Sequence, residues 1–360
     1  MNIEAICKSL GISGEIVACE VIKSGNINDT FKVKFRNDGE DISYIIQQIN
    51  TNVFKNPIRM MENVSLVTMH ISEKLGAGNE REVLSFLKTE DGKSCFFDNE
   101  RRCWRGYRFI DDSVTFDLCD DLEILEQAGF AFGNFQMLLG DFDAAKLFET
   151  IPDFHDTEKR MNTLMSHVNA DLLGRVSDAK EEIEFFRDNF DRAVKLTRMQ
   201  KAGEIPLRVT HNDTKCNNVL FDSKTKKALA VIDLDTVMPG LALHDYGDAV
   251  RFSANAANED EPDTSKIYID KDKFIAFTKG FLASCGDVLT DAEKENLVDS
   301  IIVIAMELAS RFLDDYLTGD TYFKVSYPGH NLVRTRAQIT LAKDIIARYD
   351  ELNEIIKTLL

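Results

Sequence analysis

The feature that most constrains this chain is a predicted β-hairpin near its middle. Two short apolar runs, at 219–221 and 228–232, flank a polar turn and indicate neighbouring strands. Asp213 and Asn218 precede the first run and lie five residues apart, and Asp233 follows the second run, fifteen residues after Asn218. Because a hairpin returns the chain to its starting edge, we expect Asp233 to lie beside Asp213 and Asn218.

Carboxylate and amide side chains in this arrangement suit phosphoryl transfer from ATP. The reaction needs a carboxylate that orients and deprotonates the attacking hydroxyl, for which Asp213 is the candidate, and oxygen ligands for Mg²⁺, for which Asn218 and Asp233 are the candidates. Protein kinases place an Asp and an Asn five residues apart in the same way, but neither HRD nor DFG occurs here. The pattern resembles that of the small-molecule kinases related to aminoglycoside and choline kinases.

Two other interpretations of these residues are weaker. Asp and Asn in a loop between strands are often turn residues that bond nearby backbone, but three of them at this spacing favour a shared role. Metal-dependent hydrolysis is disfavoured because His211 is the only histidine nearby and no histidine pair has ligand spacing. We expect His211 to pack and hydrogen-bond so that it fixes the loop.

Composition indicates an ordinary enzyme of two lobes. At 360 residues the chain is long for one core, and 44% hydrophobic residues suffice for two. No apolar run approaches a membrane span, and no secretory signal is visible at the start. Seven cysteines without a CxxC motif predict reduced thiols in a cytoplasmic protein. The net charge of −18 argues against nucleic acid and membrane surfaces as partners.

Strand patterns dominate the first part of the chain. We expect strands at 15–23, 30–35, 42–49, 82–87, 95–97 and 103–110, with Asn37-Asp38-Gly39 as a hairpin turn. A helix is predicted at 57–75, opened by Pro57 and carrying apolar residues at intervals of three and four. Residues 1–110 therefore predict an N-terminal nucleotide-binding lobe, with the backbone of Phe109 and Ile110 as the hinge that meets adenine.

Helical patterns dominate the remainder. We expect helices at 121–139, 158–173, 179–201, 271–284, 290–317 and 332–359, so residues 111–360 predict a C-terminal catalytic lobe. The expected fold class is α+β, a two-lobed protein-kinase-like fold. Its smaller lobe is an antiparallel sheet with one main helix, and its larger lobe is mostly helical.

Long sequence strings narrow the resemblance. The segments YIIQQIN at 44–50, WRGYRFI at 104–110, HNDTKCNN at 211–218, VIDLDTVMPG at 231–240 and RFLDDYLTGDTYF at 311–323 closely resemble N-acetylhexosamine 1-kinases. That resemblance implies a kinase that uses ATP and Mg²⁺ to phosphorylate the anomeric hydroxyl of N-acetylglucosamine or N-acetylgalactosamine. It also implies that the sugar-binding lobe is the C-terminal one.

The resemblance also implies site residues. Asp213 would be the base, Asn218 and Asp233 would hold Mg²⁺, and the sugar would be lined by Asp235, Glu307, Arg311 and Tyr322. Glu307 and Arg311 are four residues apart, so a helix would place both on one face, where they could bind sugar hydroxyls. An i,i+4 surface ion pair is the alternative for this pair.

The chain departs from the wider kinase pattern in its nucleotide-binding lobe. Gln47 and Gln48 stand where a phosphate-binding Lys is usual, and the N-acetylhexosamine 1-kinases share this trait. We expect Gln48 and Gly25, the one glycine of the loop at 24–28, to contact the nucleotide. Asn26 stands where close relatives tend to have His, so it is a candidate for sugar preference.

Two alternative functions remain open from the sequence. One is a kinase for another small alcohol, such as homoserine, methylthioribose or a different sugar. The other is a nucleotide-sensing pseudokinase, which the missing Lys suggests but which the intact Asp213, Asn218 and Asp233 disfavour. The sequence does not indicate an oligomeric state.

Overall fold

The computed structural model describes residues 2–22, 27–116 and 120–360 and divides into two compact units. Unit 1 comprises Met1–Thr115, Asp141–Pro152 and Val219–Pro239, and unit 2 comprises Phe116–Gly140, Asp153–Asn218 and Gly240–Leu360. The catalytic hairpin thus divides between the units at Asn218. The proposed lobe boundary at 110 and 111 stays a prediction.

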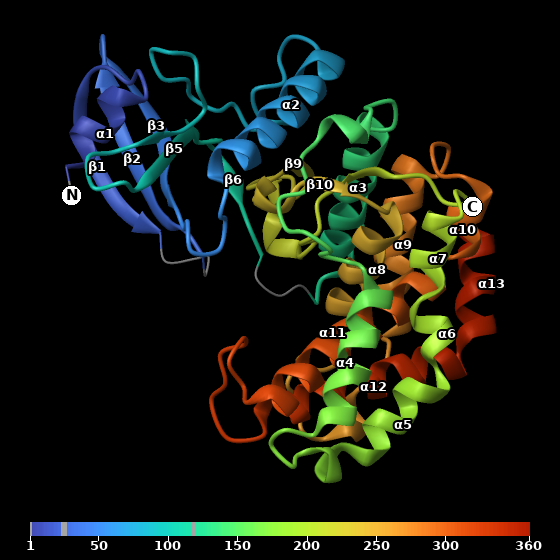
Figure 1. Ribbon diagram of the computed structural model, residues 1–360. Helices are drawn as coiled ribbons and strands as arrows, with labels where there is room; N and C mark the ends of the chain where they lie inside the picture. The colour runs from blue at the N-terminus through green and yellow to red at the C-terminus, as the bar shows by residue number, and fades with distance from the viewer. Residues whose placement is uncertain (1, 23–26, 117–119) are drawn as a thin grey trace. The chain divides into compact units, whose positions relative to one another are not determined.

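The main sheet of unit 1 is antiparallel throughout. In the described residues it contains five strands in the order β1–β2–β3–β5–β4, with the following bounds: β1 Glu15–Ile22, β2 Asp29–Asn37, β3 Glu40–Ile49, β4 Phe96–Phe97 and β5 Cys103–Arg108 (Figure 1). The predicted Asn-Asp-Gly turn joins β2 to β3, and Asp38 and Gly39 take φ angles of 50° and 88°. Such left-handed angles are the reason for Gly and Asp at this hairpin.

The two faces of this sheet meet different helices. Helix α1 (Ile3–Ser9) packs its Ile6 and Cys7 against a core that includes Ile46 and Trp104. Successive residues of a strand point to opposite faces. Gln47 therefore points away from α1, to the face on which its cross-strand neighbour Arg105 lies.

Helix α2 (Pro57–Leu75) confirms the predicted helix at 57–75. Asn56 caps its first turn by accepting from the Arg59 N–H, Pro57 occupies the first position, and Gly76 ends it at a φ of 75°. The strand predicted at 82–87 is wrong. This segment runs beside β5 but pairs with it only through an isolated bridge between Phe86 and Tyr107.

The remainder of unit 1 includes a second sheet and two segments that one buried side chain of α2 holds. The strands β6 (Ser113–Val114), β8 (Val219–Asp222) and β9 (Ala228–Val231) form a second antiparallel sheet, and β10 spans Met238–Gly240. Asn63 on α2 donates to the carbonyls of Phe148 at 2.6 Å and Val237 at 2.9 Å and accepts from the Phe148 N–H at 2.8 Å. Three separate stretches of sequence are therefore fixed by one amide.

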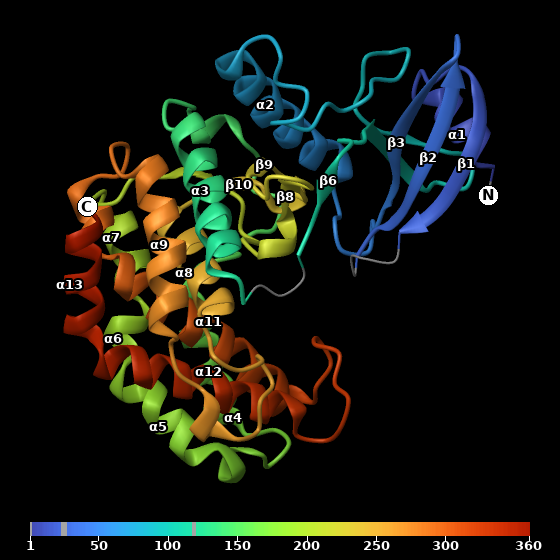
Figure 2. The same ribbon diagram turned by 180° about the vertical axis from the view of Figure 1, so that it is seen from behind.

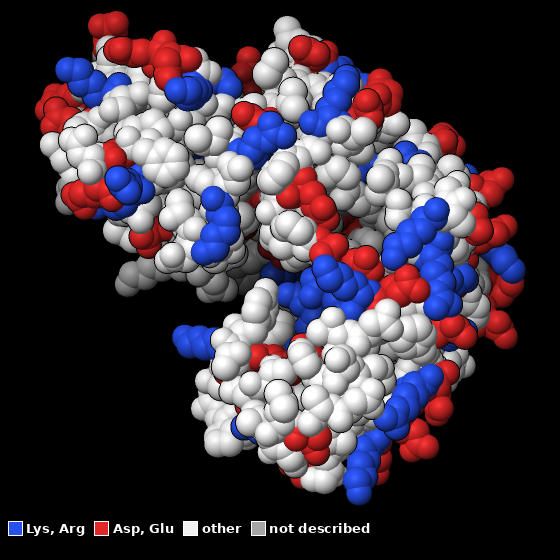
Figure 3. Space-filling view, in the orientation of Figure 1, with Lys and Arg blue, Asp and Glu red and all other residues white. Residues whose placement is uncertain are grey.

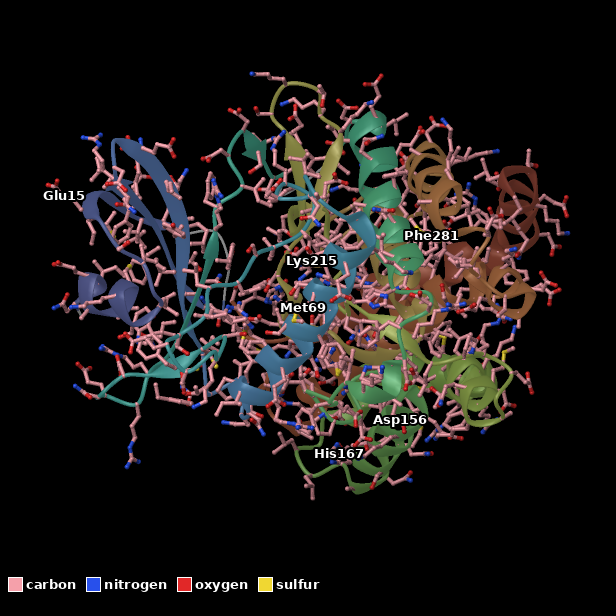
Figure 4. All side chains as sticks on the ribbon, turned by 90° about the horizontal axis from the view of Figure 1, so that it is seen from above. Glu15, Met69, Asp156, His167, Lys215 and Phe281 are labelled. Atoms are coloured by element: carbon pink, nitrogen blue, oxygen red, sulfur yellow. The ribbon has the colours of Figure 1, made fainter. Side chains whose placement is uncertain are left out.

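Unit 2 is mostly helical. Its helices are α3 Leu122–Leu138, α4 Thr157–Ala170, α5 Lys180–Asp188, α6 Phe190–Ala193, α7 Lys195–Lys201, α8 Ala242–Ser253, α9 Lys271–Cys285, α10 Asp291–Glu295, α11 Leu297–Thr318, α12 His330–Ala347 and α13 Tyr349–Leu359, and β7 spans Arg208–Thr210. Helix α4 begins after its cap Asp156 and carries His167 in its last turn (Figure 4). Unit 1, with an antiparallel sheet and one main helix, and unit 2, which is larger and mostly helical, together confirm the predicted α+β class.

Helix α11 forms the centre of unit 2. Nearly all of its side chains are buried, and it contacts α4, α8 and α12 (Figure 2). The single helices predicted at 179–201, 290–317 and 332–359 are each broken into shorter ones. At Asn296 and Arg348 φ is −108° and −104°, which departs from α-helical geometry. Helix α10 therefore ends just before Asn296 and α11 begins just after it, and α12 ends just before Arg348 and α13 begins just after it.

The described surface carries both signs of charge. Figure 3 shows acidic side chains spread over the drawn face with basic side chains among them, as the excess of 61 acidic over 43 basic residues requires. In residues 2–22, 27–116 and 120–360, no helix combines the length and the hydropathy that crossing a bilayer demands.

Glycines allow α3 and α9 to pack closely. A Cβ added to Gly280 on α9 would lie 1.9 Å from the Glu126 carbonyl oxygen of α3, and one added to Gly129 would lie 2.1 Å from the Phe277 oxygen. Distances this short exclude any side chain at these positions, so the helix pair depends on them.

We expect Gly280→Ala to destabilise unit 2 by about 1–3 kcal/mol or more, because the backbones of α3 and α9 must separate. Urea unfolding monitored by circular dichroism measures this loss. Gly140→Ala is the matched control, since its added Cβ would meet its nearest atom at 3.3 Å. Equal unfolding midpoints for the two variants would contradict the packing argument.

Candidate active site

A buried carboxylate holds the loop that carries Asp213. Asp245, on α8 and 2% exposed, accepts from the backbone N–H groups of His211 and Asn212, each at 2.8 Å. Burial raises the pKa of Asp245, and the two backbone N–H groups oppose the shift without reversing it. The loop is thereby fixed at its first two residues.

Further bonds tie the same loop to α3 and α8. Gln136 on α3 donates from Nε2 both to Asp245, at 3.0 Å, and to the carbonyl of Val209, at 3.0 Å. Thr214 donates to the Asp245 carbonyl at 2.7 Å. Sequence reasoning assigned no role to Asp245 or Gln136. The segment 242–250 also contains Asp248, so the sequence alone does not single out Asp245.

His211 packs as expected. It is fully buried, its ring meets the edges of the Phe132 and Phe135 rings at 5.7 and 6.1 Å between centroids, and its Nδ1 accepts from the Asp213 N–H at 3.3 Å. A neutral imidazole can accept at Nδ1 only when its proton is on Nε2. His211 therefore shapes the loop just before Asp213.

The Asp213 carboxylate is positioned by two neighbours in unit 2. Asn218 donates from Nδ2 to Asp213 Oδ2 at 3.0 Å and to the Asp213 carbonyl at 2.8 Å, and Lys215 (Figure 4) lies with Nζ 2.8 Å from Asp213 Oδ1. Burial lowers the pKa of Lys215, but the charge and hydrogen bond of Asp213, together with the charge of Asp248, raise it above its usual value. Since the Asn218 amide nitrogen faces Asp213, its Oδ1 is the atom suited to a metal ion.

Asp233 belongs to unit 1, where it follows β9. It is exposed and takes a left-handed φ of 59°, just before a 3-10 turn at Leu234–Thr236. An exposed carboxylate in a strained turn suits a metal ligand. Its expected proximity to Asp213 and Asn218 stays a prediction. In the described ranges, no group of three or more His, Cys, Asp and Glu residues could hold a metal by itself.

Asp235 is held inside unit 1 by a buried cation. It forms an ion pair with Arg105 in which both side chains are 3% exposed, and Asn28 donates to its Oδ2 at 2.8 Å. Arg105 in turn donates to Gln47 Oε1 at 2.9 Å. Burial lowers the pKa of Arg105, but the charge and hydrogen bond of Asp235 and further negative groups together raise it above its usual value. Sequence reasoning missed Arg105, although an arginine between apolar β5 residues is a signal.

The proposed nucleotide contacts lie at several places in unit 1. Gln48 points to the α1 face of the sheet, opposite to Gln47, and Gln47 donates to Thr30 Oγ1 at 3.1 Å. The Phe109 N–H donates to the Ser43 carbonyl at 3.0 Å, and buried Ile110 accepts from Ser113 Oγ at 2.6 Å. Gly25 and Asn26 lie outside the described residues.

Glu307 is buried on α11 with both carboxylate oxygens engaged. His155 Nδ1 lies 3.0 Å from its Oε1, Thr157 donates to its Oε2 at 2.7 Å, and Arg160 Nε lies 3.6 Å from Oε1. Burial raises the pKa of Glu307, but His155 and Arg160 outweigh this and lower it to about 2. Sequence reasoning missed these partners, since they lie some 150 residues earlier.

Arg311 faces aromatic rings and not Glu307. Its guanidinium carbon lies 5.8 Å from the Phe154 and Tyr322 ring centroids and 5.4 Å from that of Phe323, and its Nη2 donates to the Tyr322 hydroxyl at 3.4 Å. The alternative of an i,i+4 ion pair is therefore wrong, because in the described residues Glu307 pairs with His155 and Arg160. Tyr322 is 73% exposed.

A second buried acid on α11 fixes the segment that presents Tyr322. Asp315 accepts from the backbone N–H groups of Thr321, Tyr322 and Phe323 at 2.8–2.9 Å. Asn331 also donates to it, at 2.9 Å. Asp315 thus fixes the backbone of this loop by accepting from consecutive N–H groups, as Asp245 does at His211 and Asn212. The exposed Tyr322 ring is therefore attached to a fixed backbone.

We expect Asp235→Asn to cost about 3–5 kcal/mol of stability, because it leaves the buried Arg105 charge without its partner. Adding Arg105→Met should restore much of this loss, since the uncompensated cation is then gone. Denaturant unfolding of both variants and the parent measures the difference. A double variant less stable than Asp235→Asn alone would show that the pair does not act as a unit.

Known structures share this architecture at low sequence identity. The choline kinase of Cryptosporidium parvum matches with a TM-score of 0.55 at 15% identity, covering 99% of this chain and 97% of that one. An aminoglycoside phosphotransferase of Alicyclobacillus acidocaldarius matches with a TM-score of 0.59 at 11% identity and the same coverage. A spectinomycin phosphotransferase in complex with ADP and spectinomycin matches at 0.51 and 13% identity, covering 94% and 98%.

These matches confirm the predicted two-lobed, protein-kinase-like α+β fold. A sequence model of a whole family agrees with them. It is described as APH, the phosphotransferase enzyme family, and it matches residues 18–268, which is more than half of the 360 residues. The chain therefore belongs to this family of phosphotransferases.

Proposed function

We propose that this chain is an ATP-dependent kinase that phosphorylates the anomeric hydroxyl of N-acetylglucosamine or N-acetylgalactosamine. Membership of the phosphotransferase family makes it a kinase with a hydroxyl acceptor. One observation carries the catalytic part of the proposal. The Asp213 carboxylate is half-buried and held by Asn218 and Lys215 on a loop that Asp245 anchors.

Asp213 is the proposed general base. Its side chain is 31% exposed, so an acceptor hydroxyl can reach it. The bond from Asn218 fixes one oxygen and Lys215 neutralises the other, which keeps the carboxylate in place without removing it from solvent. In this role it orients the hydroxyl toward the γ-phosphate and accepts its proton in the transition state.

Asn218 and Asp233 are the proposed Mg²⁺ ligands. Amide and carboxylate oxygens are donors that Mg²⁺ accepts, and the bound ion neutralises the phosphates of ATP. A spectinomycin phosphotransferase of similar fold is described as an ADP complex, which supports a nucleotide co-substrate here. Gly25, Gln48, Phe109 and Ile110 are the proposed nucleotide contacts.

The sugar assignment rests on the sequence resemblance and on the polar groups of unit 2. Glu307 and Arg311 lie on one helix beside Phe154 and His155, and Tyr322 offers an exposed ring. Asp235 and Asn26 complete the proposed sugar contacts. The anomeric hydroxyl is the most acidic on the sugar, which suits a carboxylate base such as Asp213.

The position of the new phosphate tests this function. We expect incubation with ATP and Mg²⁺ to give a sugar 1-phosphate, whose anomeric proton couples to phosphorus in the NMR spectrum and which acid hydrolyses readily. A 6-phosphate shows neither property. Phosphate at position 6 would contradict the proposed site of phosphorylation. Turnover only with homoserine, methylthioribose, choline or another alcohol would contradict the proposed substrate.

Asp213→Asn tests the base. The amide oxygen can still accept from Asn218, so the fold should persist, while turnover should fall by about 10²–10⁴-fold or more. Asp191→Asn is the control, because Asp191 is 91% exposed on the same unit. The measurement is ADP release with the acceptor sugar. Turnover of Asp213→Asn within about threefold of the control would assign the base to another group.

A further inference from the structure

An imidazole deep in unit 2 has no partner. His244 lies on α8 and is 5% exposed, and within the described part of the chain neither of its ring nitrogens has a hydrogen-bond partner. Burying a polar group without a partner is unfavourable, and this ring buries two such atoms. That penalty points to a group that binds there.

The ring is neutral. Burial and, to a smaller extent, the neighbouring His155 lower the pKa of His244 to about 3, whereas Glu307 opposes the shift. A neutral imidazole offers one N–H donor and one acceptor nitrogen. That pair of functions matches a hydroxyl group, which both donates and accepts.

His155 adds a second oriented ring. Its centroid lies 4.6 Å from that of His244 with the planes tilted by 45°, and its side chain is 14% exposed. The Glu307 carboxylate beside Nδ1 can only accept, so Nδ1 carries a proton and Nε2 is directed away from Glu307. Thr157 occupies the other oxygen of Glu307. Glu307 is therefore a positioning residue that acts through His155.

This pair of rings adjoins the catalytic loop within unit 2. His244 directly precedes Asp245, whose carboxylate holds His211 and Asn212 and whose carbonyl accepts from Thr214, the residue after Asp213. On the other side His155 follows Phe154, whose ring meets the Arg311 guanidinium. Within unit 2 the two rings are thus linked through Asp245 to the loop of the proposed base and through Phe154 to Arg311.

We propose that His244 and the Nε2 edge of His155 bind hydroxyl groups of an uncharged polyhydroxy acceptor, with Glu307 fixing the His155 ring. The inference rests on the proposed sugar kinase function and names the groups that read the sugar. A cationic alcohol fits poorly, because Arg160 and Arg311 lie nearby and the Glu307 charge is already paired. The occupant is therefore a neutral sugar.

His244→Leu tests this assignment with two readouts. It replaces the ring by an apolar side chain of similar volume, so we expect the KM for N-acetylglucosamine and N-acetylgalactosamine to rise by about 10- to 100-fold. The KM for ATP should stay unchanged. Without sugar the melting temperature should hold or rise, because the unpaired polar atoms are removed, and the thermal stabilisation by sugar should disappear.

Two further variants make the result specific. His244→Asn keeps one donor and one acceptor and should recover part of the sugar affinity. Glu307→Gln keeps an acceptor for His155 Nδ1, so it should raise the sugar KM less than His244→Leu does. His167→Leu is the matched control: His167 lies on α4, pairs with Asp314 and is 36% exposed (Figure 4), so it should leave both KM values unchanged.

The outcomes separate this inference from the proposed function. A sugar KM for His244→Leu within about twofold of the parent overturns the inference and leaves the sugar kinase intact. A fall in melting temperature together with a raised KM that His244→Asn does not recover assigns a structural role and also overturns it. A parent enzyme that phosphorylates neither N-acetylhexosamine overturns both.

Discussion

The loop that carries Asp213 is held in place by one buried charge, the carboxylate of Asp245. Asp245 is anchored in α8, and α8 packs on α11 so closely that a Cβ on Gly247 would lie 2.5 Å from the Ser300 carbonyl oxygen. From this fixed position its two oxygens hold consecutive backbone N–H groups before Asp213. Such charge-assisted bonds in a dry site are strong, and their removal would leave unpaired groups on both sides. The position of the proposed base is thus set by the helical core of unit 2.

In unit 1 a buried positive charge, that of Arg105, holds an acidic residue in place. Arg105 holds Asp235, two residues after Asp233, and is itself held by Gln47 on the neighbouring strand. A lysine at position 47 would set a second cation beside Arg105, which Coulomb repulsion in a buried site opposes. The glutamine is neutral and accepts from the guanidinium, so its presence follows from the buried arginine. The contacts within this sheet therefore favour a glutamine over a lysine at position 47.

The sequence predicted what depends on short-range patterns. The turn at 37–39, the helix at 57–75 and the strands of the catalytic hairpin follow from periodicity and capping, and each is present. Breaks at Asn296 and Arg348 were not predicted, because the apolar pattern continues across them. The partners of Glu307 were also missed. His155 and Thr157 reach it from 152 and 150 residues away, and only tertiary packing makes such contacts.

The polar groups proposed to transfer the phosphoryl group differ in chemistry from those proposed to bind the acceptor. The groups at Asp213 are charged or polar, and Asp233 has an exposed carboxylate that could bind a cation, as the proposed transfer of a highly charged phosphoryl group requires. At His244 and His155 the Glu307 carboxylate is already engaged by protein partners, and ring nitrogens are left to donate or accept hydrogen bonds. Such groups discriminate by the geometry of hydrogen bonds, since a missing hydroxyl leaves a buried partner unsatisfied. Recognition of the acceptor and activation of its hydroxyl can therefore be changed separately, and mutations at 244 should alter acceptor choice before they alter the chemistry at Asp213.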